Sequence, residues 1–197
     1  KELIESVKEE GYEYSPPDGE NRYLGMVVKR IGRSGLALTQ EPYITDVMIK
    51  YGFDRCKETR APNPGGHVRA QDCAKCKPDQ NPHASRYREL CGVLRWIETC
   101  TRPDISATLG ELSKFQINPG EDHIRRLEHL MRYVSTTRHH CLHYGASKKN
   151  TANGLLVGYM DSDWAGDKDT FASRGGWIFT SWPVSYTHLR AHETLLY

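Results

Sequence analysis

Apolar residues recur at the spacing of one helical face in three stretches of the chain, and this pattern constrains the fold more than any other feature. We predict helices over residues 42–52, 85–100 and 119–137. A helix with one apolar face must bury that face against another element, so these helices require a hydrophobic core. The three stripes consist of Tyr43, Ile44, Val47, Met48 and Tyr51, then Tyr87, Leu90, Cys91, Leu94 and Ile97, then Ile124, Leu127, Met131 and Val134.

Proline and glycine mark the expected ends of the helices. Pro42, Pro103 and Pro119 suit the first turn of a helix, where a backbone N–H is not needed. Gly52 suits the C-terminal end of the first helix, because glycine adopts a left-handed conformation without steric cost. A helix that starts at Pro103 is expected to end near residues 117–120.

Strand patterns occur on both sides of the helices. Residues 23–30 and 36–40 flank a turn that contains glycine, which predicts a β-hairpin. Strand-like segments follow the last helix at residues 141–145, 155–163 and 175–182. Strands and helices in separate blocks predict an α+β fold.

Residues 53–84 differ from the rest of the chain in composition, being rich in Pro, Gly, Asn, Lys and Asp. The segment is too long and too polar for an ordinary connection between two helices. We interpret it as a linker or exposed loop and expect it to separate two packing units.

Composition excludes several classes of protein. No run approaches the ~18 apolar residues of a membrane span, and the first residues lack the apolar core of a signal peptide. The six cysteines come without a secretory signal, which favours reduced thiols in an intracellular protein. A net charge of +2 means that any attraction of nucleic acid is local. The chain begins at Lys1 rather than at a methionine, so we expect a fragment.

Cys73 and Cys76 have the two-residue spacing with which two thiolates bind one tetrahedral zinc ion. Cys56, His67 and His83 are conceivable completing ligands. No second closely spaced Cys/His pair accompanies them, so chance cysteines in a loop are the more common interpretation of this pattern.

The polar face of the last predicted helix carries Arg125, His129 and Arg132. Such a face can follow a phosphate backbone, because Lys and Arg side chains supply most of the sequence-independent affinity for nucleic acid. A solvated helix face is the more common interpretation, and the acidic residues Glu121, Asp122 and Glu128 dilute the positive charge.

Asp161 and Asp163 end a strand pattern. Carboxylates at this position either face water in a turn or bind a cation such as Mg²⁺. Two-metal phosphodiester chemistry needs about four converging carboxylates, of which one strand end supplies one or two. A single Asp-x-Asp sequence is more often a turn.

Five segments follow one another over most of residues 20–180. They are YLGMVVKR, LALTQEPYITDVMIKYGFDRCK, YRELCGVLRWIETCTRPDI, LSKFQINPGEDHIRRLEHLMRYVSTTRHHCLHYG and LVGYMDSDWAGDKDTFASRGGWIFT. Together they resemble the Pol polyprotein of copia-type LTR retrotransposons, in which a reverse transcriptase precedes RNase H. Arg102, Pro103 and Asp104 are part of this family signature, and the position of Pro103 at a helix start accounts for that residue.

The resemblance implies a division of the chain into parts of these two enzymes. From about Tyr186 the sequence departs from the family pattern. The expected parts are the end of the palm and start of the thumb (1–52), a loop or linker (53–84), the helical thumb and connection (85–150), the first strands of an RNase H-like sheet (151–185) and a foreign or disordered tail without a sheet partner (186–197).

The resemblance also implies contacts with nucleic acid. Tyr23, Leu24 and Gly25 match a hairpin that grips the primer end in reverse transcriptases, where glycine permits close approach of the backbone. The face formed by Arg125, His129 and Arg132 (125–132) becomes a candidate for binding the template-primer backbone.

Asp161 matches the first carboxylate of an RNase H site and is the expected catalytic residue and metal ligand, with Mg²⁺ as the cofactor of the parent enzyme. Asp163 is the weaker candidate. The polymerase Asp pair of the family lies upstream of Lys1, and the other RNase H carboxylates lie beyond the break in the pattern. We therefore expect a fragment that is inactive alone, holds no Mg²⁺ stably and at most binds nucleic acid.

The expected partners in the parent protein are an RNA/DNA template-primer and the rest of Pol, with no membrane. The expected location is intracellular, in a cytoplasmic virus-like particle or the nucleus. The alternatives are a domesticated nucleic-acid-binding module and an interaction domain stabilised by zinc.

Overall fold

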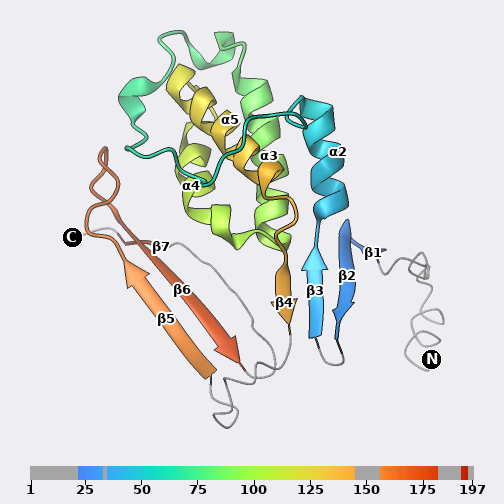
Figure 1. Cartoon of the computed structure of the whole chain (residues 1–197). Coiled ribbons are helices and arrows are strands. Elements are labelled where there is room, and N and C mark those ends of the chain that lie inside the picture. Colours follow the sequence, from blue (N-terminus) through green and yellow to red (C-terminus); the bar gives the residue numbers. More distant parts are fainter. Residues whose placement is uncertain (1–21, 33–34, 145–155, 182–191, 195–197) are drawn as a thin grey trace, which may run out of the picture.

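The computed structural model describes residues 22–32, 35–144, 156–181 and 192–194. This part of the chain is mixed α and β, with a group of helices and two small antiparallel sheets (Figure 1). The mixed composition agrees with the predicted α+β class. No helix among the described residues combines the length and apolarity needed to cross a membrane.

The first sheet has the order β1-β2-β3-β4, and all its strands are antiparallel. β2 (Met26–Ile31) and β3 (Gly35–Thr39) form the predicted hairpin, with Val28 opposite Leu38. β1 (Arg22–Tyr23) lies on one edge, and β4 (Leu142–Tyr144) joins β3 on the other. The chain therefore leaves this sheet after β3 and returns to it after the last helix.

The helices surround one hydrophobic core. They are α2 (Glu41–Tyr51), α3 (Ala84–Cys100), α4 (Ser106–Leu112) and α5 (Glu121–Thr136). The predicted apolar stripes of α2, α3 and α5 face this core, as expected from their spacing. Its fully buried side chains include Ile44 and Met48 of α2, Leu94 and Ile97 of α3, Leu109 and Leu112 of α4, and Leu130, Met131 and Val134 of α5.

Residues 53–84 lie across the helices and do not separate two packing units (Figure 1). The expectation of two units is wrong because α2 contributes to the same core as the helices that follow the segment. Phe53 and Val68 of the segment also pack against this core. Two short 3₁₀ turns, η1 (Ala70–Asp72) and η2 (Pro78–Gln80), lie within it.

The helix ends follow the predicted signals with two differences. Pro42 lies in the first turn of α2, and Gly52 ends that helix in the left-handed conformation. Pro103 begins a 3₁₀ turn, η3 (Pro103–Ile105), and α4 follows it. Pro119 lies just before α5 and not in its first turn. The N-cap residue of α5 is Gly120, which has an extended backbone and donates its N–H to the ring of His123.

The second sheet has the order β5-β6-β7. β5 (Leu156–Ser162) and β6 (Ser173–Ser181) form an antiparallel pair in which Asp161 lies opposite Gly176. β7 (His192–Thr194) pairs with β6, whereas we expected residues 186–197 to have no sheet partner. Residues 186–191 and 195–197 lie outside the described part of the chain.

The turn between β5 and β6 reaches the helical unit. The Asp167 carboxylate forms an ion pair with Lys114, which follows α4 in the 3₁₀ turn η4 (Ser113–Phe115). Asp169 accepts a hydrogen bond of 2.6 Å from the backbone N–H of Ala70 in η1. These two contacts place one end of the second sheet beside the helices.

Candidate nucleic-acid interface

Side chains along the polar face of α5 hold the preceding loop against the helix. Residues 53–69, here called the strap, cross this face and present backbone carbonyl groups to it (Figure 1). The bonds join His123 Nε2 to Arg69 O at 3.0 Å, Arg126 Nη1 to Gly65 O at 2.8 Å, His129 Nε2 to Ala61 O at 3.0 Å, Thr136 Oγ1 to Thr59 O at 3.0 Å and Ser135 Oγ to Phe53 O at 2.7 Å. Five polar side chains of one helix thus fix the course of the strap.

The three predicted basic residues of α5 have different surroundings. Arg125 is the most open, with a 72% exposed side chain and Asp122 at 3.6 Å. The His129 ring lies against the Ala61 carbonyl oxygen. Arg132 Nε donates to the Glu128 carbonyl oxygen at 3.3 Å, and its guanidinium lies 3.7 Å from the Glu128 carboxylate. Arg125 is therefore the member of this trio best placed to reach an external phosphate.

The turn between β1 and β2 is formed by Leu24 and Gly25. Tyr23 pairs with Met26, so the two turn residues connect adjacent strands directly. Both have positive φ, 51° for Leu24 and 76° for Gly25, as two-residue hairpin turns that fit the sheet twist require. The Leu24 side chain is 59% exposed, so this turn presents an apolar tip to solvent.

Trp96 of α3 lies beside this turn and was missed by the sequence analysis. A Cβ atom at Gly25 would lie 4.0 Å from the Trp96 indole nitrogen. The signal was available, because Trp96 falls outside the apolar stripe of its helix and is exposed. The exposed Trp96 therefore borders Gly25, the residue that follows the exposed Leu24 in the turn.

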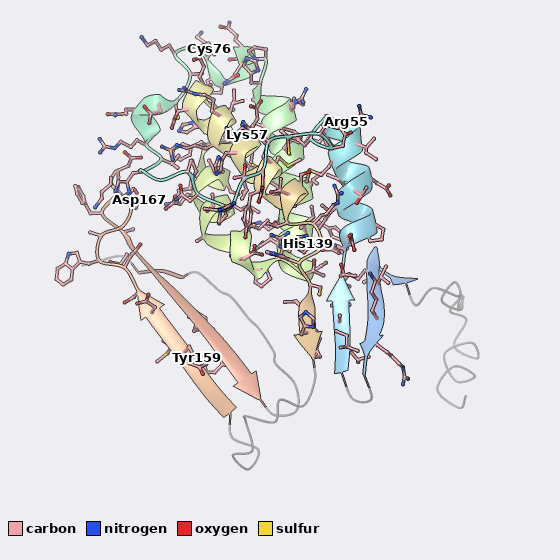
Figure 2. The ribbon with its side chains drawn as sticks, in the orientation of Figure 1. Arg55, Lys57, Cys76, His139, Tyr159 and Asp167 are labelled. Atoms are coloured by element: carbon pink, nitrogen blue, oxygen red, sulfur yellow. The ribbon has the colours of Figure 1, made fainter. Side chains whose placement is uncertain are left out.

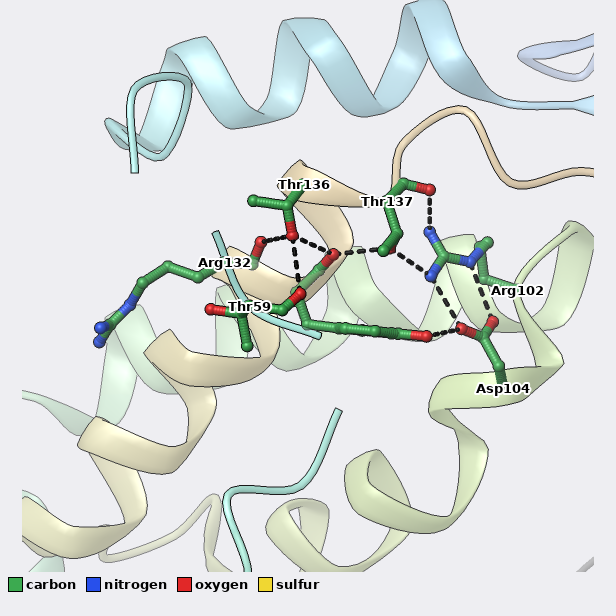
Figure 3. A network of polar contacts seen from close by, with 7 residues as sticks. Thr59, Arg102, Asp104, Arg132, Thr136 and Thr137 are labelled. Atoms are coloured by element: carbon green, nitrogen blue, oxygen red, sulfur yellow. Dashed lines mark hydrogen bonds and ion pairs between the residues drawn. The ribbon is translucent and has the colours of Figure 1, made fainter. Parts of the chain in front are cut away.

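The signature residues Arg102 and Asp104 form a structural network with α5 (Figure 3). The Arg102 guanidinium binds the Asp104 carboxylate through Nε at 2.9 Å and Nη2 at 2.8 Å. It also donates to the carbonyl oxygen of Thr137 at 3.0 Å, at the C-terminal end of α5. The Tyr133 hydroxyl donates to Asp104 Oδ2 at 2.8 Å. Arg102 and Asp104 thus have a structural role, which is to attach η3 to the end of α5.

Charge and burial act against each other on the Asp104 carboxyl. Burial raises its pKa, but the hydrogen bonds and positive charge of Arg102 outweigh burial, so the pKa lies below its ordinary value. Asp104 is therefore ionised at neutral pH and balances the charge of Arg102, whose side chain is only 1% exposed.

Asp161 lies at the exposed end of β5. Its Oδ1 accepts a hydrogen bond of 2.9 Å from the backbone N–H of Ser162. The adjoining shallow hollow, of about 360 Å³, is lined by Met160, Ser162, Gly175, Gly176 and Trp177 besides Asp161 itself. This lining supplies no second carboxylate, so the described residues do not by themselves form a Mg²⁺ site.

The comparisons identify relatives along most of the chain. A retrovirus-related Pol polyprotein from the transposon TNT 1-94 of Nicotiana tabacum is 32% identical over 160 residues, which are 80% of this chain and 12% of the relative. One from the transposon RE1 of Arabidopsis thaliana is 33% identical over 157 residues, which are 79% of this chain and 10% of the relative. Over about four fifths of its length, this chain is similar to retrovirus-related Pol polyproteins of copia-type transposons. The predicted resemblance is confirmed.

This Pol-related chain spans only about a tenth of the length of these relatives. A shorter relative, an uncharacterised mitochondrial protein of Arabidopsis thaliana, is 30% identical over 154 residues, which are 78% of this chain and 60% of that protein. No family model matches the chain. No solved structure matches it either.

The Pol-related chain does not gather the cysteines and histidines considered for zinc. Within the described ranges, no group of three or more His, Cys, Asp or Glu side chains is arranged to hold a metal ion. Cys76 is exposed, and the Cys56 thiol lies 4.0 Å from the carbonyl oxygen of Arg132.

Proposed function

We propose that this chain is the part of a copia-type Pol polyprotein that runs from the end of the reverse transcriptase palm to the first strands of RNase H, and that it binds the RNA/DNA template-primer. The observation that carries the proposal is the match of about four fifths of the chain to retrovirus-related Pol polyproteins. By analogy with the family, the helical unit corresponds to the thumb and connection. The second sheet corresponds to the start of RNase H.

Two features of the described residues support binding of nucleic acid. The turn Tyr23–Gly25 offers a close backbone approach and an exposed Leu24, with the exposed indole of Trp96 beside it. Exposed aromatic rings stack on bases without regard to sequence. On α5, Arg125 presents a cation to solvent, while His129 and Arg132 order the same face.

The chain alone is proposed to have neither polymerase nor RNase H activity. Asp161 would supply one carboxylate toward Mg²⁺ in the parent enzyme, since its side chain is exposed at a strand end. The other ligands would have to come from elsewhere in Pol, because the hollow beside Asp161 contains no second carboxylate. The bound metal would supply activation of water for phosphodiester hydrolysis.

The binding proposal is tested by fluorescence anisotropy with a labelled RNA–DNA hybrid at several salt concentrations. We expect a Kd of roughly 1–100 µM near physiological salt that weakens steeply as salt rises. Arg125→Gln should weaken binding several-fold. Arg86→Gln, which removes an exposed charge on α3, is the matched control. Absence of salt-dependent binding by the wild-type chain would refute the proposal.

The proposed inactivity is tested on the same hybrid in the presence of Mg²⁺. We expect no cleavage of the RNA strand above background. Cleavage by the wild-type chain that disappears in Asp161→Asn would show that the chain completes its own metal site, and would overturn this part of the proposal.

A further inference from the structure

In the first part of the strap, every third side chain faces the helices and the side chains between them face solvent. Phe53, Cys56 and Thr59 are partly buried, whereas the basic residues between and after them are exposed. Arg55 is 95% exposed and Arg60 is 91% exposed. Because the inward residues are spaced by three, Arg55, Lys57 and Arg60 lie on the outer side of the strap. Figure 2 shows the positions of Arg55 and Lys57.

The backbone of the strap is fixed although its basic side chains are free to extend. Thr136 and Ser135 hold the carbonyl groups of Thr59 and Phe53. The His129 ring, in the middle of α5, forms a hydrogen bond with the carbonyl group of Ala61 in the strap. A fixed backbone presents its cations at constant spacing, which lowers the ordering cost of binding a regular ligand.

The strap carries a net positive charge. Residues 53–69 contain four basic residues, Arg55, Lys57, Arg60 and Arg69, and two acidic residues, Asp54 and Glu58, which leaves a net charge of +2. The whole chain also has a net charge of +2, so the remainder is neutral.

Local acidic partners neutralise the strap only weakly. The Arg55 guanidinium lies 3.5 Å from the Asp54 carboxylate and that of Arg60 lies 3.8 Å from the Glu58 carboxylate, with both arginines almost fully exposed. Exposed pairs of this kind contribute about 0–1 kcal/mol, so a phosphate group can readily replace them.

We infer that the outer side of the strap, through Arg55, Lys57 and Arg60, is a binding surface for the phosphate backbone of a nucleic acid duplex. The inference rests on the proposed function and assigns its electrostatic contacts to the strap as well as to α5. Arg125 is a further exposed cation on α5, about one helical turn before the His129 that holds the strap. His129 and Thr136 act beneath this surface as positioning residues for the strap.

The test uses the full chain and the labelled RNA–DNA hybrid, with Arg55→Gln, Lys57→Gln and Arg60→Gln combined. Each lost phosphate contact lowers the slope of log K against log salt by about 0.9 for a duplex, so we expect the slope to fall by roughly 3. At ~100 mM salt the affinity should fall at least tenfold. The control combines Lys75→Gln, Lys77→Gln and Arg86→Gln, which remove the same charge from other exposed positions.

A second variant, Ser135→Ala with Thr136→Val, keeps every cation and removes two of the bonds that hold the strap. We expect it to weaken binding several-fold while circular dichroism shows an intact helical unit. Equal losses of slope in the strap and control triples would overturn the inference and leave the proposed function standing. No binding by the wild-type chain would instead refute the proposed function itself.

Discussion

Arg102 shows how a single residue connects separate elements of this molecule. Its buried guanidinium joins η3 to the C-terminal end of α5 through Asp104 and Thr137. The guanidinium carbon also lies 5.3 Å from the centre of the Tyr133 ring, a distance at which cation–π attraction operates. The two bonds to Asp104 depend on the planar fork of arginine, which lysine does not reproduce.

We predict that Arg102→Ala lowers the free energy of unfolding by about 3 kcal/mol, because it removes the buried cation that balances the Asp104 carboxylate and binds the Thr137 carbonyl group. Arg102→Lys should lose an intermediate amount. Urea denaturation followed by circular dichroism measures both. Arg95→Ala, which removes the pair between the 48% exposed Arg95 side chain and Glu98, is the control and should cost less than Arg102→Ala. Equal losses for Arg102→Ala and Arg95→Ala would contradict the structural role of Arg102.

His123 is a buried imidazole whose protonation state is set by its two hydrogen bonds. Its Nδ1 accepts from the Gly120 N–H at 3.1 Å, so the ring proton is on Nε2, which donates to the Arg69 carbonyl oxygen at 3.0 Å. The Phe115 ring stacks on it at 4.1 Å. Burial lowers the pKa of His123 below the ordinary 6.5, despite the Arg69 carbonyl that favours the charged form.

The lowered pKa of His123 predicts a loss of stability at acidic pH. Below a pH of about 6.5 the unfolded chain binds a proton at this histidine more readily than the folded chain does. The free energy of unfolding therefore decreases as the pH decreases. The contribution is complete above about 6.5 and is lost as the pH falls through the lowered pKa. Urea denaturation between pH 7.5 and 5 measures the slope, and His123→Gln should flatten it. An unchanged slope in His123→Gln would contradict the assignment.

At the scale of elements, the strap depends on a close approach between η1 and the start of α5. A Cβ atom at Gly120 would lie 1.7 Å from the carbonyl oxygen of Asp72, a distance that no packing tolerates. The backbone of Gly120 is extended, so the requirement for glycine comes from this neighbour and not from its own conformation. The sequence pattern around Pro119 gave no sign of the contact.

We predict that Gly120→Ala destabilises the fold by about 2 kcal/mol or more, because η1 and the end of the strap must move away from α5. Gly92→Ala is the matched control, since Gly92 is an exposed residue inside α3 with no atom within 4 Å of an added Cβ. That substitution should stabilise the protein by about 0.5–1 kcal/mol, through the unfolded chain and helix propensity. Thermal unfolding of both variants separates these outcomes, and a neutral Gly120→Ala would show that the approach is looser than described.

At the scale of the whole molecule, the second sheet contacts the helices through the turn between β5 and β6. The ion pair with Lys114 is the largest cause of the depressed pKa of Asp167, and backbone N–H groups of Asp169 and Thr170 add to it. Asp169 itself binds the Ala70 N–H in η1. The end of the strap and the turn of the second sheet therefore meet at η1.

We predict that Lys114→Gln increases hydrogen exchange of backbone amides in residues 163–172, because the turn loses its charged partner on η4. The unfolding free energy should change by less than about 1 kcal/mol, since the pair is near the surface. Salt at ~1 M should produce a similar increase in the wild-type chain. Lys168→Gln, which alters a cation within the same turn, is the control. Unchanged exchange in Lys114→Gln would show that other contacts hold the turn.

The sequence by itself determined the local elements of this protein. The hairpin of β2 and β3, the stripes of α2, α3 and α5, and Gly52 as a helix end follow from periodicity and from glycine conformation, which are properties of neighbouring residues. The order of five motifs gave the resemblance to Pol polyproteins, which the comparisons confirm.

Only the tertiary structure decided what the loop between α2 and α3 does. Composition predicted a separating linker, but the hydrogen bonds that fix the strap join residues far apart in the chain, such as Thr59 and Thr136. The same is true of the roles of Arg102 and Gly120, and of Trp96 beside Gly25. These contacts depend on how the shared core orients α5 and α3, and no periodicity within a single segment encodes that orientation.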